Sequence, residues 1–295
     1  ASALSEVRGT YGIAVIFRDA PEVLYAAAFG SPIAIGVGEG EMWVASDASA
    51  LIQETKRVVY LEDGEYATVT PTAYTIKSLK HEQHVREPQV LDMSADELTK
   101  HGYPHFMLKE IMEIPTVVAD TMRGRLNPGS AAVKLGGLDD VERELRAAES
   151  LTIVGCGSAY YAGLYGKYLI EDVACMPVEI TLGSEQRYRA ALPTQSKVML
   201  AVSQSGETAD TLASIKEAKK LGVLTLGLVN VVGSTIARTT DAGVYNHAGP
   251  EIGVASTKAF VSQLVALVLV ALKLGVMKGC KTTSLTALAR ELAQV

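Results

Sequence analysis

Apolar and polar residues follow different periods in the two parts of the chain. Over residues 10–77 they alternate with a period of two, and glycine-containing turns such as 38–41 and 62–65 separate the apolar runs. Alternation of this kind predicts short strands that bury one face, and hence a layered, mainly antiparallel sheet structure. The expected strands are Thr10–Phe17, Val23–Ala28, Ile33–Val37, Met42–Ser46, Arg57–Leu61 and Tyr66–Thr70, with a short helix at Ser49–Thr55.

A polar bridge over residues 78–105 follows, after which helical spacing resumes over Phe106–Thr121. Four of the five histidines lie in this bridge: His81, His84, His101 and His105. A metal site is one interpretation of such a group, but histidines in a polar segment are more often simply solvated. We therefore expect no metal site.

From about residue 150 the pattern alternates between strand and helix. Alternation of this kind predicts a parallel five-stranded sheet with helices on both faces, an α/β fold with ligands at the carboxyl ends of the strands. The expected strands are Thr152–Gly155, Val178–Leu182, Val198–Val202, Val223–Val229 and Gly243–Asn246. The expected helical segments are Tyr160–Ala174, Ser184–Ala191, Thr208–Leu221, Ser234–Thr239 and Ala255–Leu274.

The turn after the third of these strands carries the clearest chemical signal. Hydroxyl, amide and glycine residues fill the step from strand to helix, in the run Ser203-Gln204-Ser205-Gly206-Glu207-Thr208. Free N–H groups at a helix start, with converging hydroxyl donors, suit a phosphate. The turn contains no lysine and so differs from the P-loop of nucleotide hydrolases. Serine and threonine are also ordinary helix caps, but four hydrogen-bonding side chains in six residues exceed what capping requires.

Two further loops are expected at the same edge of the sheet. The loop 155–163 begins Gly155-Cys156-Gly157, but Tyr160 stands where a dinucleotide-binding motif has its third glycine, which argues against NAD. Cys156 has no base beside it and is expected to be a small buried residue rather than a nucleophile. The loop 247–258 again combines glycine, hydroxyls and a helix start. Because all three loops follow strands of one parallel sheet, they can share one ligand.

Composition narrows the class of protein. The 295 residues are 48% hydrophobic and 20% charged, enough for two globular domains. A net charge of −6 without a basic cluster argues against nucleic acid. Three cysteines without metal-ligand spacing fit a reduced, cytoplasmic protein, and the first ten residues lack the apolar core of a signal peptide. The apolar run Ala259–Leu272 falls short of the ~20 residues that span a membrane and predicts a buried helix.

Several motifs together resemble the glutamine–fructose-6-phosphate aminotransferase family. CGSAYYAG, SQSGETADT, GPEIGVASTKAF and SEQRYR are similar to its first sugar isomerase (SIS) domain, and HFMLKEIMEIP to the segment that precedes this domain. RGTYGIAVIF, FGSPIAIGVGEGEMWVASD and YLEDGEYATVT resemble the later part of its glutaminase domain, an Ntn-hydrolase fold. The resemblance implies four segments: 1–78 from the glutaminase domain, a linker and connecting helix over 79–130, the SIS domain over 131–280, and the start of a linker over 281–295.

The resemblance also implies site residues. The phosphate of fructose 6-phosphate would be held by Ser203, Gln204, Ser205 and Thr208, and the sugar lined by Ser158, Val254 and Ser256. Ala159 departs from the family, whose members often have a serine donor there. One lost donor weakens binding by about 1.5–3 kcal/mol if nothing replaces it.

The family's catalytic groups for glutamine hydrolysis and isomerisation have no equivalent among these residues, so no catalytic residue is expected in this chain. The whole enzyme would pass glutamine-derived ammonia to the ketose and isomerise it to glucosamine 6-phosphate, without metal or cofactor. The family implies a homodimer.

A non-catalytic SIS-type sugar-phosphate-binding module is the alternative, and the glutaminase-like first 77 residues argue against it. A simple phosphosugar isomerase would need a base, for which Glu251, His247 and Lys258 are the candidates.

Overall fold

The computed structural model describes residues 2–91, 99–127, 132–189, 198–280 and 282–294. Contacts divide the chain into two compact units, Ala1–Thr99 and Lys100–Val295. The boundary between the units, after Thr99, falls in the polar bridge over residues 78–105, which lies between the two periodic regions of the sequence.

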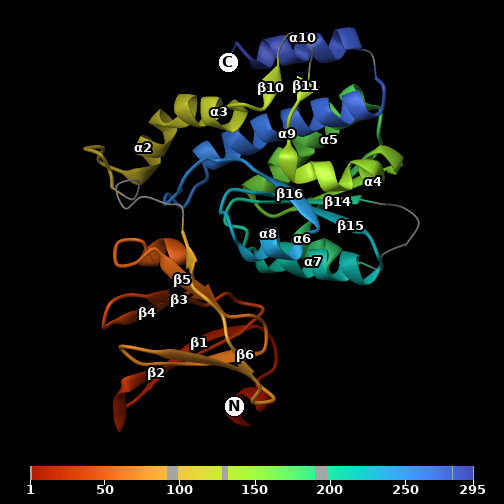
Figure 1. The fold of residues 1–295 in the computed structure, drawn as a ribbon. Helices are drawn as coiled ribbons and strands as arrows, with labels where there is room; N and C mark the ends of the chain where they lie inside the picture. Colours follow the sequence, from red (N-terminus) through yellow and green to blue (C-terminus); the bar gives the residue numbers. More distant parts are fainter. Residues whose placement is uncertain (1, 92–98, 128–131, 190–197, 281, 295) are drawn as a thin grey trace. The chain divides into compact units, whose positions relative to one another are not determined.

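The first unit contains two antiparallel sheets around a shared apolar core, as the period-two pattern predicts (Figure 1). Alanine, valine and isoleucine side chains from both sheets form this core, among them Ala26, Ile35 and Val59. One sheet has the order β1 (Tyr11–Phe17), β2 (Ala20–Phe29), β6 (Glu65–Val69), β7 (Tyr74–Ser78) and β8 (Gln83–His84). The other has the order β4 (Met42–Ala45), β3 (Ala34–Val37), β5 (Arg57–Tyr60) and β9 (Gln89–Val90). The helical pieces among the described residues of this unit are α1 (Ser2–Glu6) and the 3₁₀ turn Ala48–Leu51.

Strands β7, β8 and β9 correct the sequence prediction, which ended the sheets at residue 70 and made 78–105 a bridge. Two-residue strands such as β8 and β9 are held by main-chain pairing and show no side-chain period. A buried ion pair fixes the segment after β8, because Arg86 donates to both carboxylate oxygens of Glu65 at 2.9 and 3.1 Å. His84 adds a third contact to Glu65, and Glu65 is 3% exposed.

The second unit is built on a parallel five-stranded sheet with the order β13, β12, β14, β15, β16, which confirms the predicted α/β fold. The bounds are β12 Leu151–Gly155, β13 Val178–Leu182, β14 Val198–Ser203, β15 Leu224–Val229 and β16 Ala242–Tyr245. The apolar residues of the three central strands are buried on both faces, as continuous hydrophobic strands require.

Helices cover both faces of this sheet (Figure 1). One apolar cluster lies under α5 and α9, and a second lies under α7 and α8. The helices are α2 (Phe106–Met112), α3 (Ile114–Met122), α4 (Glu142–Ala147), α5 (Ser158–Ala174), α6 (Gly183–Gln186), α7 (Ala209–Lys220), α8 (Thr235–Thr239), α9 (Lys258–Met277) and α10 (Thr282–Leu292). A 3₁₀ turn spans Gly136–Val141, and β10 (Leu126–Asn127) pairs with β11 (Ala132–Val133). Part of the helix expected at Ser184–Ala191 lies outside the described residues.

Helix α9 is the apolar centre of the second unit. It has 20 residues, and its most apolar window of 18 residues has a mean hydropathy of 2.2, so by length and composition it could cross a membrane. The helix is therefore longer than the apolar run Ala259–Leu272 that the sequence analysis considered too short to span a membrane. Most of its leucine and valine side chains are buried against the sheet and α5, as Leu267, Leu269 and Leu272 show with 0% exposure. The burial confirms a core helix.

The expected linker over 281–295 contains helix α10. Its Leu285, Ala289 and Leu292 belong to the same apolar cluster as α9. The segment is thus packed on the unit that precedes it.

Candidate functional site

The strand order reverses between β12 and β14, which makes this pair of strands the switch point of the sheet. Helix α5 follows β12 on one face of the sheet, whereas α7 follows β14 on the other. In open parallel sheets, ligands bind at such a point, outside the carboxyl ends of the two strands. The predicted loops 155–163 and 203–208 both begin there, because β12 ends at Gly155 and β14 at Ser203.

Ser203 organises the turn after β14 from within. It is 2% exposed. Its Oγ accepts a hydrogen bond from the Gly206 N–H at 3.0 Å and lies 3.0 Å from the Thr208 hydroxyl. Its role as a direct phosphate donor stays a prediction. The side chain turns inward because the short step from strand to helix leaves the Gly206 amide in need of a partner.

Ser205, Gln204 and Thr208 are half-buried and lie on the outer part of the turn. The Ser205 hydroxyl accepts from the Glu207 N–H at 3.1 Å and keeps its own proton to donate. Thr208 is the residue before α7 and makes no side-chain capping bond to that helix in the described part of the chain. The first N–H groups of α7 therefore remain without a side-chain cap from Thr208.

Gly206 is required by the shape of the turn. Its φ is +68°, a left-handed conformation that favours glycine. A Cβ built on it would lie 2.0 Å from the Ser234 Oγ. That hydroxyl is fully buried and has no hydrogen-bond partner among the described residues.

The loop after β12 offers fewer groups. Gly157 has φ +58° and precedes α5, and Ser158 is the exposed first residue of that helix. Ala159 is 6% exposed and packs into the core. Cys156 is half-buried, with its Sγ 3.7 Å from the Thr211 hydroxyl. Ser158 is thus the exposed serine of this loop.

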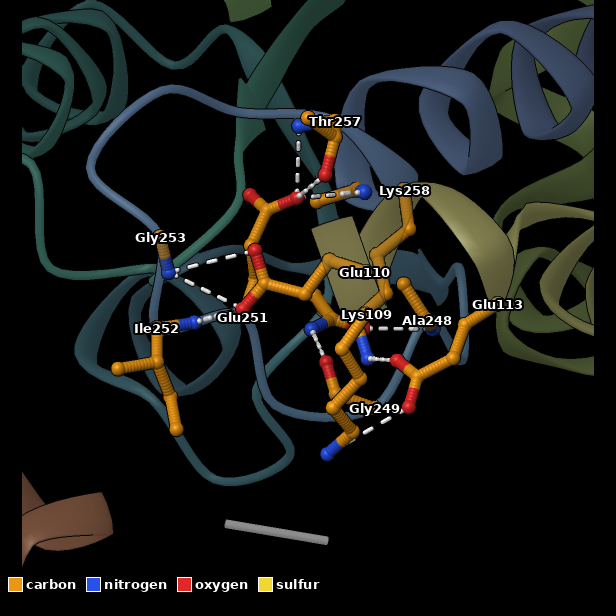
Figure 2. A network of polar contacts seen from close by, with 12 residues as sticks. Lys109, Glu110, Glu113, Ala248, Gly249, Glu251, Ile252, Gly253, Thr257 and Lys258 are labelled. Carbon is orange, nitrogen blue, oxygen red and sulfur yellow. Dashed lines mark hydrogen bonds and ion pairs between the residues drawn. The ribbon is translucent and has the colours of Figure 1, made fainter. Parts of the chain in front are cut away.

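The third loop differs from the expectation of an open helix start. Glu251 accepts from the N–H groups of Thr257 and Ala259 at 2.8 and 3.0 Å, so its carboxylate occupies the N-terminus of α9 (Figure 2). Ser256 donates to the other oxygen at 2.9 Å. Val254 is fully exposed at the tip of the loop. A helix N-terminus favours a carboxylate as it favours a phosphate, so an internal anion fills this position.

These contacts bear on the three candidate bases for an isomerase. Glu251 is the cap of α9. Lys258 is 4% exposed and donates to Glu113 Oε2 at 2.6 Å. His247 has φ +55° and is exposed. Two of the three candidates thus have structural partners.

Asn230 is a site residue that the sequence did not single out. It follows β15, and its N–H donates to the Gln204 carbonyl at 3.2 Å. Its side chain donates to the Gly249 carbonyl at 2.6 Å and accepts from the Ala248 N–H at 2.7 Å. Asn230 therefore joins the turn after β14 to the third loop. The signal in the sequence that could have identified Asn230 is its place as a single polar residue directly after an apolar strand.

Glu110 and Glu113 of the segment around α2 were also missed. Glu110 accepts from the Ile252 N–H at 2.6 Å and from the Gly253 N–H at 3.0 Å (Figure 2). Glu113 lies between Lys258 and Lys109, at 2.6 and 3.5 Å from their Nζ atoms. These glutamates are far from the loop in sequence, so no local pattern connects them.

Comparisons with known proteins agree with the motifs. The sequence profile of the SIS domain matches residues 144–273. The glutamine–fructose-6-phosphate aminotransferase (isomerizing) of Chlorobaculum tepidum is 45% identical over 293 residues, covering 99% of this chain and 48% of that protein. Its namesake from a strain of Thermus thermophilus is 43% identical over 277 residues, covering 94% of this chain and 45% of that protein.

A solved structure supports the same assignment for the second unit. The C-terminal domain of glucosamine-fructose-6-phosphate aminotransferase from Francisella tularensis is similar with a TM-score of 0.62 and 36% identity. The match covers 66% of this chain and 55% of that chain. The chain spans about half the length of the curated relatives it matches. It contains a SIS domain and belongs to the glutamine–fructose-6-phosphate aminotransferase family.

Proposed function

We propose that the second unit binds the phosphate of fructose 6-phosphate outside the carboxyl ends of β12 and β14. The chain would serve as part of an enzyme that transfers glutamine-derived ammonia to this sugar and isomerises it to glucosamine 6-phosphate. The turn after β14 carries the proposal. It combines a helix start that Thr208 leaves without a side-chain cap with half-buried hydroxyl and amide groups at the switch point of a parallel sheet.

The site residues divide by role. Ser205, Gln204 and Thr208 would donate to the phosphate, and Ser158 would line the sugar from the loop after β12. Ser203 holds Gly206 and Thr208 in position. Val254 and Ser256 belong to the loop that would line the sugar. The phosphate is thus held by neutral donors, which suits a ligand that must be released as product.

A non-catalytic sugar-phosphate-binding module remains the second candidate. The similarity to the aminotransferases extends over 99% of the chain and so includes the antiparallel first unit. A binding module has no need of that unit, so the similarity favours the enzyme. We place the segment boundaries at 78, 130 and 280, and propose a cytoplasmic homodimer without nucleic-acid, membrane, metal or cofactor partners.

Calorimetric titration tests this proposal. We expect the chain to bind fructose 6-phosphate and glucosamine 6-phosphate but not NADH. Ser205→Asp places a negative charge at the phosphate position, so binding should fall by at least about tenfold.

Ser150→Asp is the matched control, because Ser150 precedes β12 and lies at the amino edge of the same sheet. It should bind as the unchanged chain does. Equal binding by Ser205→Asp and the unchanged chain, or tight NADH binding without a phosphosugar response, would contradict the proposal.

A further inference from the structure

Helix α2 has its polar and apolar sides reversed relative to an ordinary surface helix. Lys109 and Glu110 are 3% and 2% exposed. Its apolar side chains are the exposed ones, with Met107 at 44% and Met112 at 58%. Surface helices normally bury the apolar stripe and expose the charges. The charged side of α2 must therefore have partners inside the unit.

The partner of Glu110 is the main chain of the third loop. Its Oε1 accepts from the N–H groups of Ile252 and Gly253 at 2.6 and 3.0 Å, and its Oε2 lies 3.3 Å from the Gly253 nitrogen (Figure 2). These amides precede Val254, the exposed tip of the loop. Hydrogen bonds from amides to a carboxylate are among the stronger ones in proteins.

Gly253 shows how closely the carboxylate fits the loop. A Cβ on Gly253 would lie 2.6 Å from the Glu110 Oε2. The φ of Gly253 is not positive, so the backbone alone does not call for glycine there. The missing side chain leaves room for the Glu110 carboxylate.

The rest of the loop is held from two other directions. Asn230 binds its beginning at Ala248 and Gly249. Glu251 binds its end through Ser256, Thr257 and Ala259. Between these two anchors, Glu110 is the residue that binds the loop in the described part of the chain. Without it, the amides of Ile252 and Gly253 would lose their partner.

We infer that Glu110 is a positioning residue for sugar recognition. It fixes residues 252–253 so that Val254 and Ser256 meet the sugar, and its hydrogen bonds go to the loop rather than to the phosphate turn. This inference rests on the proposed function. Losing Glu110 should therefore weaken recognition of the sugar while leaving recognition of the phosphate in place.

Two ligands separate these effects. Fructose 6-phosphate would contact both the turn and the loop, whereas glycerol 3-phosphate carries the phosphate without the sugar. With Glu110→Ala in the full chain, calorimetry should show fructose 6-phosphate binding weakened about tenfold. Glycerol 3-phosphate binding should change by less than about twofold. General destabilisation would weaken both ligands alike.

Three variants complete the test. Glu110→Gln keeps an acceptor for the two amides and should restore most of the preference for the sugar. Gly253→Ala displaces the carboxylate without removing it and should behave as Glu110→Ala does, which covers the case of a misfolded Glu110 variant. Glu113→Gln is the control, because Glu113 binds the side chains of Lys109 and Lys258 rather than the amides of Ile252 and Gly253. It should lower thermal stability and leave the preference unchanged.

The outcomes are distinguishable. If the unchanged chain binds both ligands and neither Glu110→Ala nor Gly253→Ala alters their ratio, the positioning role is refuted and the proposed function stands. If the unchanged chain binds neither ligand, the proposed function fails, and the positioning role with it.

Discussion

Gly206 and Ser203 decide the shape of the proposed phosphate turn. Ser203 holds the turn from inside, through the Gly206 N–H and the Thr208 hydroxyl. Gly206 supplies a left-handed backbone conformation and leaves room for Ser234. The donors that face the ligand are thus positioned by residues that do not have to contact it. Such support keeps a binding site in the geometry that binding needs.

Gly206→Ala should therefore impair ligand binding more than the addition of one methyl group would at an unstrained position. The added methyl group meets the Ser234 Oγ, and the positive φ adds about 1–2 kcal/mol of strain. We expect fructose 6-phosphate affinity to fall by about tenfold in a titration. Gly222→Ala is the control, since Gly222 has φ +72° and nothing lies within 4 Å of its Cβ position. It should lower stability alone, and equal affinity losses in both variants would refute this role of Gly206.

At the scale of elements, α9 carries the core and the third loop. Its buried apolar side chains fill the space between the sheet and α5, and its N-terminus is capped by Glu251. Helix α2 holds that loop from outside the sheet through Glu110. The site thus depends on a helix that precedes the sheet in sequence as well as on the sheet's own loops.

Leu269→Ala tests the contribution of α9. Leu269 is 0% exposed, so the truncation should lower the free energy of unfolding of the second unit by about 2–5 kcal/mol. Val276→Ala on the same helix is the control, because Val276 is 49% exposed and should change it by about 0.5 kcal/mol or less. Urea unfolding followed by circular dichroism measures both. Similar small effects would mean that α9 is not the core of the unit.

At the scale of the whole molecule, the two units have separate apolar cores, and the unfolding of the first unit has a fluorescence signal of its own. The single tryptophan, Trp43, lies in β4 of the first unit. Its fluorescence therefore reports the first unit, where Glu65 joins Arg86 and His84.

Burial of Glu65 by itself raises the pKa of its carboxyl. Hydrogen bonds from Arg86, from the Glu62 N–H and from His84 outweigh it, so the pKa lies below its usual value.

This shift predicts acid sensitivity of the first unit. Because the folded pKa of Glu65 is lowered, its stabilisation is present above the unfolded pKa of about 4.3 and is lost as pH falls through the folded pKa. Urea midpoints from Trp43 fluorescence should fall steeply below about pH 4.3. Glu65→Gln should be less stable at neutral pH and show a weaker slope in that acid range. The same slope in both proteins would show that Glu65 is not responsible.

The sequence predicted what depends on local periodicity. The strands of both units, the parallel sheet and the turn at 203–208 follow from apolar runs and the residues between them. It missed β7, and it could not predict β8 and β9, which are two residues long and show no side-chain period. Nor could it predict the roles of Glu110 and Asn230, which arise from contacts between distant segments. The inward turn of Ser203 was missed because a hydroxyl pattern does not say which way each hydroxyl points.

Amide chemical-shift mapping of the isotope-labelled chain with fructose 6-phosphate tests the central claim most directly. The account predicts the largest shifts at residues 204–209 and 158–160, with smaller ones at 252–256. Shifts confined to the first unit, or to the amino edge of the parallel sheet, would contradict it.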